Sequence, residues 1–188
     1  NKTDFYYNRA ANGGALFVGG EGITNYVYTS VFKGNNATEG YGGAINWLAS
    51  SGTIKDSNFK SNSAIYGGGI ALGLNSKNSN LSNIVFDSNY ASKNGGAIDC
   101  NASHMVLNNV TFKYNIADEY GAALCREVNA TGGSGYNNTF IGNHAGIAGA
   151  ALGWMGSVGI KIDTYFFYNN TAGNGGGAIY VSPTSHNC

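Results

Sequence analysis

One short motif occurs seven times in this chain at an almost constant spacing. Each copy reads Phe-x-x-Asn-x-Ala, followed by a short gap and a glycine-rich tetrad that ends in isoleucine or leucine. A fixed period of this size is typical of a solenoid, in which each repeat buries its apolar face against its neighbours. The phenylalanines, separated by 26 to 28 residues, are Phe5, Phe32, Phe59, Phe86, Phe112, Phe140 and Phe167.

The composition favours strands over helices as the elements of each repeat. The 188 residues include 30 glycines and one proline, and no repeat holds a continuous helical pattern of about 10–12 residues. Glycine and asparagine at corners fit three short strands per repeat. We therefore predict an all-β fold, a single-stranded parallel β-helix (solenoid) of about seven coils with a period of about 27 residues, in which residues 1–188 form one domain.

Aligning the repeats places an asparagine at the same position in every coil. Asparagine tolerates the left-handed backbone of a sharp corner, and its amide can bond to the coils on either side. We expect a structural ladder, because stacked amides satisfy one another without charge; a ligand-binding ridge is the alternative. The ladder residues are Asn8, Asn35, Asn62, Asn89, Asn115, Asn143 and Asn170.

Apolar columns accompany this ladder. The last residue of each glycine tetrad and the residue two positions later are expected to face the interior, because strand side chains alternate between faces. A third apolar column lies five residues before the column phenylalanine. Gly135 replaces a valine, leucine or isoleucine in this column, and Arg126 replaces an apolar residue two positions after a tetrad. We expect the strand to end at Arg126.

The two parts of the motif lie together in Phe32–Ile45, Phe86–Ile98 and Phe167–Ile179. On these motifs, which recur over nearly the whole chain, the sequence resembles the passenger regions of chlamydial polymorphic outer-membrane proteins and the adhesin-like surface proteins of methanogenic archaea. The resemblance implies a right-handed parallel β-helix on a cell surface, acting in adhesion or as envelope structure. Three tetrads depart mildly from the family motif: Gly67–Ile70 carries three glycines, and Gly121–Leu124 and Gly149–Leu152 each carry two alanines.

The charge balance argues against nucleic acid and membranes as partners. The formal net charge is zero and 11% of the residues are charged, so the chain lacks the basic surface that nucleic acid requires. No run of about 18 apolar residues is present, so we expect no segment that spans a bilayer.

Eight Asn-x-Ser/Thr triplets are candidate N-glycosylation sites of an extracellular glycoprotein. Asn109 and Asn137 both lie three residues before a column phenylalanine, so glycans on both would shield one face. Chance triplets in a chain rich in asparagine and threonine are the alternative. The candidate sites are Asn1, Asn36, Asn80, Asn101, Asn109, Asn129, Asn137 and Asn169.

Three cysteines leave at least one thiol without a partner in the chain. Aligned by their tetrads, Cys100 and Cys125 lie in adjacent coils one position out of phase, so Cys100 is expected to point inward and Cys125 outward. This disfavours a disulfide between them, and Cys188 is left for a partner outside this segment or in another chain. No cysteine shows metal-ligand spacing with a histidine, so we predict no metal site.

Parallel β-helices also carry polysaccharide lyases and hydrolases, which need clustered carboxylates or a calcium site. Acidic residues are sparse here, and Glu39 and Glu119 both precede a tetrad but lie three coils apart, roughly 14 Å by strand spacing. The glycine- and aspartate-rich calcium repeat is missing. We therefore expect no catalytic residue and no cofactor, and predict that the chain is not an enzyme.

Several of the 13 tyrosines fall at outward positions. Tyr41, Tyr66 and Tyr120 immediately precede a glycine tetrad, and we expect them to form a broken aromatic strip along one edge. Such a strip suits sugar stacking or protein docking. Ordinary stacking that joins successive coils is the alternative.

The leading functional prediction is a non-catalytic structural or adhesin-like protein, secreted or at the cell surface, that forms a stalk, envelope or fibre element. The candidate partners are the chain itself, by end-to-end stacking, and other cell-surface proteins and glycans. A self-assembling filament subunit is the first alternative; a carbohydrate-active enzyme or receptor-binding spike on the same fold is the second. We expect the sequence to be a segment of a longer chain or a stackable subunit.

Overall fold

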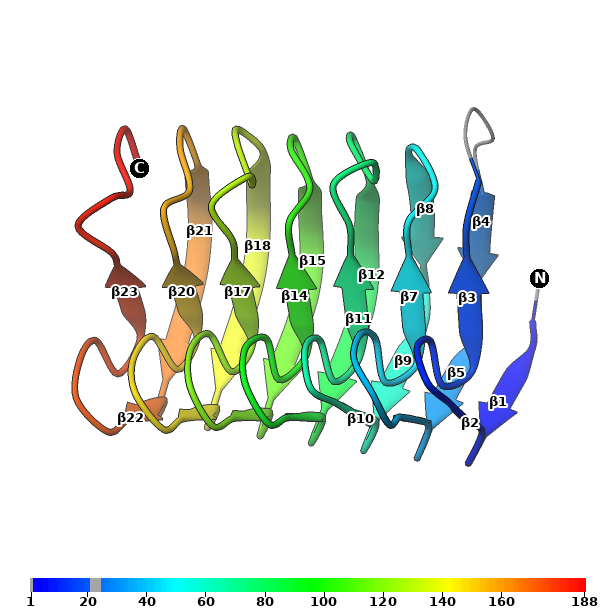
Figure 1. Cartoon of the computed structure of the whole chain (residues 1–188). Helices are drawn as coiled ribbons and strands as arrows, with labels where there is room; N and C mark the ends of the chain where they lie inside the picture. The colour runs from blue at the N-terminus through cyan, green and yellow to red at the C-terminus, as the bar shows by residue number, and fades with distance from the viewer. Residues whose placement is uncertain (1, 21–24) are drawn as a thin grey trace.

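The computed structural model describes residues 2–20 and 25–188, which form 23 strands and no helix. The chain winds into coils that lie side by side along one axis (Figure 1). We number the coils one to seven by their column phenylalanine; six full turns separate Phe5 from Phe167. The predicted parallel β-solenoid with a period of about 27 residues is confirmed.

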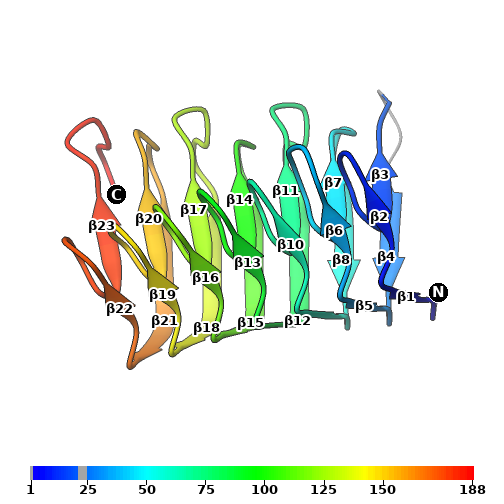
Figure 2. The ribbon, with the colours of Figure 1, turned by 60° about the horizontal axis from the view of Figure 1, so that its bottom comes forward.

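Three parallel sheets run along the rod, and Figure 2 brings the short strands of the second into view. The first sheet holds β1 (Asp4–Tyr6), β4 (Asn25–Tyr28), β5 (Val31–Lys33), β8 (Gly52–Lys55), β9 (Asn58–Lys60), β12 (Asn80–Asp87), β15 (Val106–Lys113), β18 (Ser134–Ile141) and β21 (Lys161–Tyr168). The second holds β2 (Arg9–Ala10), β6 (Asn36–Ala37), β10 (Ser63–Ala64), β13 (Tyr90–Ala91), β16 (Ile116–Ala117), β19 (His144–Ala145) and β22 (Thr171–Ala172). The third holds β3 (Leu16–Val18), β7 (Ile45–Trp47), β11 (Ile70–Leu72), β14 (Ile98–Cys100), β17 (Leu124–Arg126), β20 (Leu152–Trp154) and β23 (Ile179–Val181).

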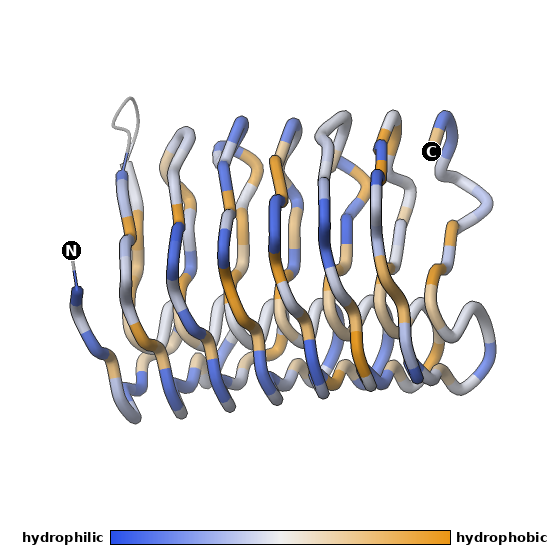
Figure 3. Tube along the Cα trace, turned by 180° about the vertical axis from the view of Figure 1, so that it is seen from behind, coloured by the Kyte–Doolittle hydropathy of each residue, from blue (hydrophilic) through white to orange (hydrophobic). Residues whose placement is uncertain are grey.

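Equivalent residues of successive coils pair with one another. Phe86 pairs with Phe59 on one side and Phe112 on the other, and Ile70 pairs with Ile45 and Ile98. Each column of the aligned sequence is therefore a column in space, and apolar residues recur at the same place in successive coils (Figure 3).

The phenylalanine column forms the centre of the core. The five rings from Phe32 to Phe140 are fully buried, and successive rings from Phe5 to Phe167 stack with centroids 4.7 to 5.1 Å apart. This separation is close to the spacing of hydrogen-bonded strands. The rings can therefore stack without disturbing the hydrogen-bonded pairing of the strands that carry them.

The asparagine ladder runs between the first and second sheets. Asn62 shows the pattern, because its Nδ2 donates to Oδ1 of Asn89 at 2.9 Å and to the carbonyl oxygen of Phe32 at 3.0 Å. The backbone N–H of Asn62 donates to the same Oδ1 at 3.0 Å. Amide bonds of this kind join every successive pair from Asn8 to Asn170. The buried corner is thus satisfied without charge.

One expectation about this corner is wrong. The left-handed backbone falls on the residue before each ladder asparagine, such as Ser61 (φ 52°) and Ser88 (φ 56°), and not on the asparagine itself. The asparagine is required instead for its side-chain amide, which bonds to the coils on both sides.

A second row of polar residues crosses the exposed face of the first sheet. Asp56, Asn83, Asn109 and Asn137 all have left-handed backbones, with φ of 52 to 54°. Each asparagine Nδ2 donates to the coil before it: Asn83 to Asp56 at 2.8 Å, Asn109 to Asn83 at 2.8 Å, and Asn137 to Asn109 at 3.2 Å. The rod therefore carries one buried and one exposed amide row.

The glycine tetrad turns the chain into the third sheet. Gly95 opens one tetrad with a left-handed backbone (φ +69°), and a Cβ on Gly96 would overlap the carbonyl oxygen of Ile116. Coils five and six depart from the glycine motif at its second position, where Ala122 and Ala150 pack in a small cluster with neighbouring alanines. The departure is therefore accommodated by local packing.

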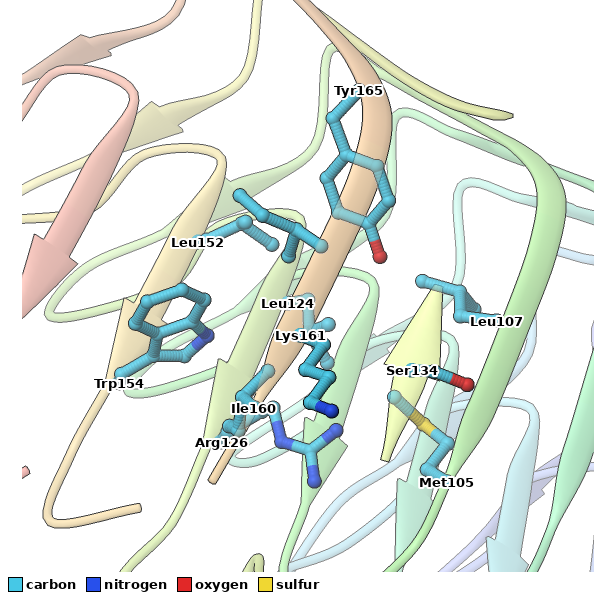
Figure 4. A pocket seen from close by; sticks show the side chains of 11 residues that line it. Met105, Leu107, Leu124, Arg126, Ser134, Leu152, Trp154, Ile160, Lys161 and Tyr165 are labelled. Atoms are coloured by element: carbon cyan, nitrogen blue, oxygen red, sulfur yellow. The ribbon is translucent and has the colours of Figure 1, made fainter. Parts of the chain in front are cut away.

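The two residues that break the apolar columns are both accommodated in the interior. The Tyr165 side chain of the next coil occupies the space beside Gly135. Strand β17 ends at Arg126 as expected, and this arginine is 3% exposed. Its Nη2 donates to the carbonyl oxygen of Gly132 at 2.8 Å, while its Nε has no partner. Figure 4 shows Arg126 and Tyr165 at an interior pocket of about 10 Å³.

None of the described residues belongs to a helix long and apolar enough to cross a membrane.

Candidate functional site on the outer face of the third sheet

The middle residues of the third-sheet strands form an outward-facing row that is nevertheless buried in coils two to five. Strand register places Asn46, Ala71, Asp99 and Cys125 beside one another in that order. Their exposed fractions are 4, 3, 4 and 0%. Because these side chains point away from the core, segments outside the sheet must cover them.

A groove of about 190 Å³ lies over part of this row. Its floor includes Asn46, Ala71 and Asp99, and its walls include Tyr41 and Leu74. The leucine is 55% exposed and the tyrosine 48% exposed. The groove thus combines an aromatic ring, aliphatic surface, an amide and a carboxyl group, which is the mixture typical of small-ligand sites.

The predicted tyrosine strip forms in two separate parts. Tyr41 and Tyr66 stack with centroids 5.1 Å apart, and Lys93 Nζ lies 5.6 Å from the Tyr66 ring centre. Tyr120 does not continue this stack but packs on Tyr180 at 5.8 Å. The strip is interrupted at coil four, where Asn94 replaces tyrosine in front of the tetrad.

Two acidic residues and a cysteine form a cluster next to Asn94. Asp99, Cys125 and Glu127 each place one oxygen or sulfur atom within 4.8 Å of the others. Asn94 Nδ2 donates to Glu127 Oε1 at 3.0 Å, and Cys125 Sγ donates to the same oxygen at 3.6 Å. One Asp99 oxygen is buried without a hydrogen-bond partner.

Burial dominates the electrostatics of this cluster. It raises the pKa of the Asp99 carboxyl well above its ordinary value, and the neighbouring Glu127 carboxylate raises it further. Burial also raises the pKa of the Cys125 thiol, with the Asp99 and Glu127 charges acting in the same direction. The neutral forms of the Asp99 carboxyl and the Cys125 thiol are therefore favoured.

Cys100 and Cys125 lie in the predicted phase. Cys100 pairs with Arg126 and Cys125 with Asp99, so the two thiols lie one position out of phase and on opposite faces. The expectation that Cys125 points outward holds, but it is fully buried, because alternation fixes direction and not coverage. All three cysteines, including exposed Cys188, are free thiols.

The candidate glycosylation sites lie at the surface wherever they are described. Asn1 lies outside the described residues. Asn36 and Asn101 are partly buried, and the exposed ones are Asn80, Asn109, Asn129, Asn137 and Asn169. Asn129 Nδ2 donates to Asn101 Oδ1 at 3.0 Å, so two candidate acceptors in neighbouring coils bond to each other.

Sequence reasoning missed the acidic cluster, because it compared the cysteines only with the histidines. The signal was present in the alignment of the tetrads. Asp99 and Cys125 both directly follow the last residue of a tetrad, and Glu127 lies two residues beyond Cys125 on the same side of the strand.

Two segments of the chain, each with one copy of the repeat motif, match a known protein family. The model of the Chlamydia polymorphic membrane protein repeat matches residues 83–101 and 165–182. These segments contain the Phe86 and Phe167 motifs, and the match confirms the resemblance to the chlamydial proteins. No curated protein and no solved structure matches the chain. The chain therefore carries repeats similar to those of the Chlamydia polymorphic membrane proteins, wound into a parallel β-solenoid.

Proposed function

We propose that this chain is a non-catalytic, adhesin-like element of a cell surface, a stiff solenoid that presents a binding groove on the outer face of its third sheet. The repeat match to a membrane-protein family supports the surface location. The continuous phenylalanine and asparagine columns support the stiff scaffold, because every coil is joined to the next by ring stacking and amide bonds.

The groove beside the stacked Tyr41 and Tyr66 rings carries the binding part of the proposal. Aromatic faces stack on the apolar faces of sugar rings, while amide and carboxyl groups bond to hydroxyls. Asn46 and Asp99 supply those groups on the groove floor. Glycans of a host or neighbouring cell surface are therefore the proposed ligand class, with surface proteins as the other partners.

Glycan binding to the purified chain tests this proposal. Immobilised glycans should retain the wild-type chain, and Tyr41→Ala should weaken binding about tenfold or more through loss of the stacking surface. Tyr114→Ala is the matched control, since this tyrosine is 56% exposed but lies outside the groove. Equal binding by the two variants, or binding by neither variant nor wild type, would contradict the assignment.

Surface location has its own test. Protease added to intact cells should cleave the native protein, while a cytoplasmic marker in the same cells stays whole. Protection of the chain until the cells are lysed would contradict a surface location.

The predicted sequons enter the same proposal as glycan attachment sites. Their exposure makes the amides of Asn80, Asn129 and Asn169 accessible to a modifying enzyme. Intact-mass measurement of native material before and after enzymatic deglycosylation should show discrete losses. A native mass equal to that of the unmodified chain would contradict glycan attachment.

A further inference from the structure

The cluster of Asp99, Cys125 and Glu127 shares Asp99 with the groove, but Cys125 and Glu127 do not line it. The fold brings the three side chains together from two coils. Asp99 is the middle residue of β14 and pairs with Cys125, the middle residue of β17. Because Glu127 lies two positions after Cys125, it projects to the same side of the sheet.

The backbone beyond β17 keeps Glu127 in place. Its N–H donates to the carbonyl oxygen of Cys100 at 2.9 Å, which extends the pairing of coils four and five past the strand end. On the side chain, Asn94 Nδ2 donates to Oε1 at 3.0 Å. Asn94 in turn accepts from the Tyr120 N–H at 3.3 Å, so a neighbouring loop orients the carboxylate.

A separate observation concerns a buried polar atom of this cluster. Asp99 is 96% buried, from its exposed fraction of 4%, yet one of its carboxyl oxygens has no hydrogen-bond partner. Asp99 and Cys125 are buried and Glu127 is partly buried, and one oxygen or sulfur atom of each lies within 4.8 Å of the others, so the unpartnered carboxyl oxygen belongs to a group of three atoms that could hold a cation.

We propose that Asp99, Cys125 and Glu127 bind a divalent zinc ion that joins coils four and five. A thiolate ligand selects zinc over magnesium and calcium, which prefer all-oxygen sites. On binding, the Cys125 thiol releases its proton to solvent and a Zn–S bond forms. Three protein ligands leave the fourth tetrahedral position to water, and Asn94 is a positioning residue through its bond to Glu127.

The first test uses Co²⁺ as a spectroscopic probe for the zinc site. Chain stripped of metal with a chelator should bind one Co²⁺ and show a thiolate-to-cobalt charge-transfer band, which Zn²⁺ then abolishes by displacement. Cys125→Ser should lose the band. Cys188→Ser and Cys100→Ala are the matched controls and should keep it, because Cys188 lies on the exposed tail and Cys100 faces the core.

Thermal unfolding supplies the second readout. Zn²⁺ at about a hundred times its Kd should raise the Tm of the wild-type chain by roughly 5–10 °C, and the rise should vanish in Asp99→Asn and Glu127→Gln. These isosteric variants keep the test valid if Cys125→Ser fails to fold.

Two results would overturn the proposal. One is cobalt binding without the charge-transfer band, or with a band that Cys125→Ser retains. The other is a wild-type Tm that does not respond to Zn²⁺ while Asp99→Asn is more stable in chelator, which would show that Asp99 and Glu127 share a proton instead.

Discussion

In both the asparagine corner and the outer row of the third sheet, equivalent residues of successive coils lie beside one another, but the corner repeats one residue type and the outer row does not. In the corner, one residue type recurs in all seven coils, and its amide bonds run from coil to coil without a break. In the outer row the residue changes at every coil, and Asp99 has an oxygen without a partner. That row reads Phe17, Asn46, Ala71, Asp99, Cys125, Gly153 and Tyr180.

This difference indicates that the repeated residues specify the fold, while the varied residues supply the chemistry of a site. Each amide inside the ladder bonds to an asparagine in the coil on either side, so a substitution at one position removes bonds to both neighbours. A side chain on the outer row contacts the covering loops, which differ from coil to coil. The repeating columns therefore specify the solenoid, and the outer row of the third sheet contributes the residues of the candidate binding groove.

The largest effect is expected in the repeating core. Phe86→Ala should lower the free energy of unfolding by about 3–5 kcal/mol, because it removes a fully buried ring stacked between two others. Phe166→Ala is the matched control in the same sheet; this ring is 56% exposed and its loss should cost less than about 0.5 kcal/mol. Denaturant unfolding measures both, and similar costs would contradict the column assignment.

Next comes the contrast between the two amide rows. Asn89→Ala should cost about 2–3 kcal/mol, since it leaves the Asn62 amide and the Phe59 carbonyl oxygen buried without their partner. Asn83→Gly in the exposed row keeps the left-handed backbone and should change stability by less than about 0.5 kcal/mol. Melting curves of the two variants side by side decide the matter; equal costs would mean that burial does not distinguish the rows.

A smaller change of opposite sign is expected at Arg126. Its guanidinium is buried with one carbonyl partner and an unpartnered Nε. Arg126→Met replaces a buried charge with an apolar chain of similar length, so the variant should be more stable by about 1 kcal/mol. A lower Tm would show that the bond to Gly132 is worth more than the removal of the charge.

The smallest effect concerns a surface ion network across coils three to five. Asp87 Oδ2 lies 3.4 Å from Lys60 Nζ and 3.3 Å from Lys113 Nζ. Partial burial acts to raise the pKa of Asp87, but the Ser88 hydroxyl and the two lysines outweigh it and lower the pKa below its ordinary 3.8. A lowered carboxyl pKa stabilises the fold above pH 3.8, and this stability is lost as the pH falls through the folded-state pKa.

Asp87→Asn should therefore cost less than about 1 kcal/mol at neutral pH, because both lysines are substantially exposed. The difference between wild type and variant should shrink as the pH falls from 3.8 through the folded-state pKa of Asp87. Melting temperatures across that range provide the measurement, and a difference that persists in acid would assign the cost to lost packing instead of charge.

The sequence was sufficient for those parts of the molecule that depend on the period. The spacing from Phe5 to Phe167 places the rings in one column, and the asparagine that follows each ring is placed with it. Alternation predicted that Cys125 points outward, whereas what covers it depends on segments outside the strand. Arg126 was identified as the end of a strand, but its burial depends on a carbonyl acceptor at Gly132, six residues further along the chain.

The two amide rows also give the rod a direction. In the asparagine ladder the Nδ2 of each residue from Asn8 to Asn143 donates to the Oδ1 of the following coil, so the amide dipoles add head to tail as peptide dipoles do in a helix. In the exposed row the Asp56 carboxylate accepts from Asn83, and the dipoles there point toward the preceding coil. The solenoid thus contains two rows of aligned amide dipoles that point in opposite directions along its axis. The dipoles of the ladder act mostly in the low-dielectric interior, whereas water screens those of the exposed row.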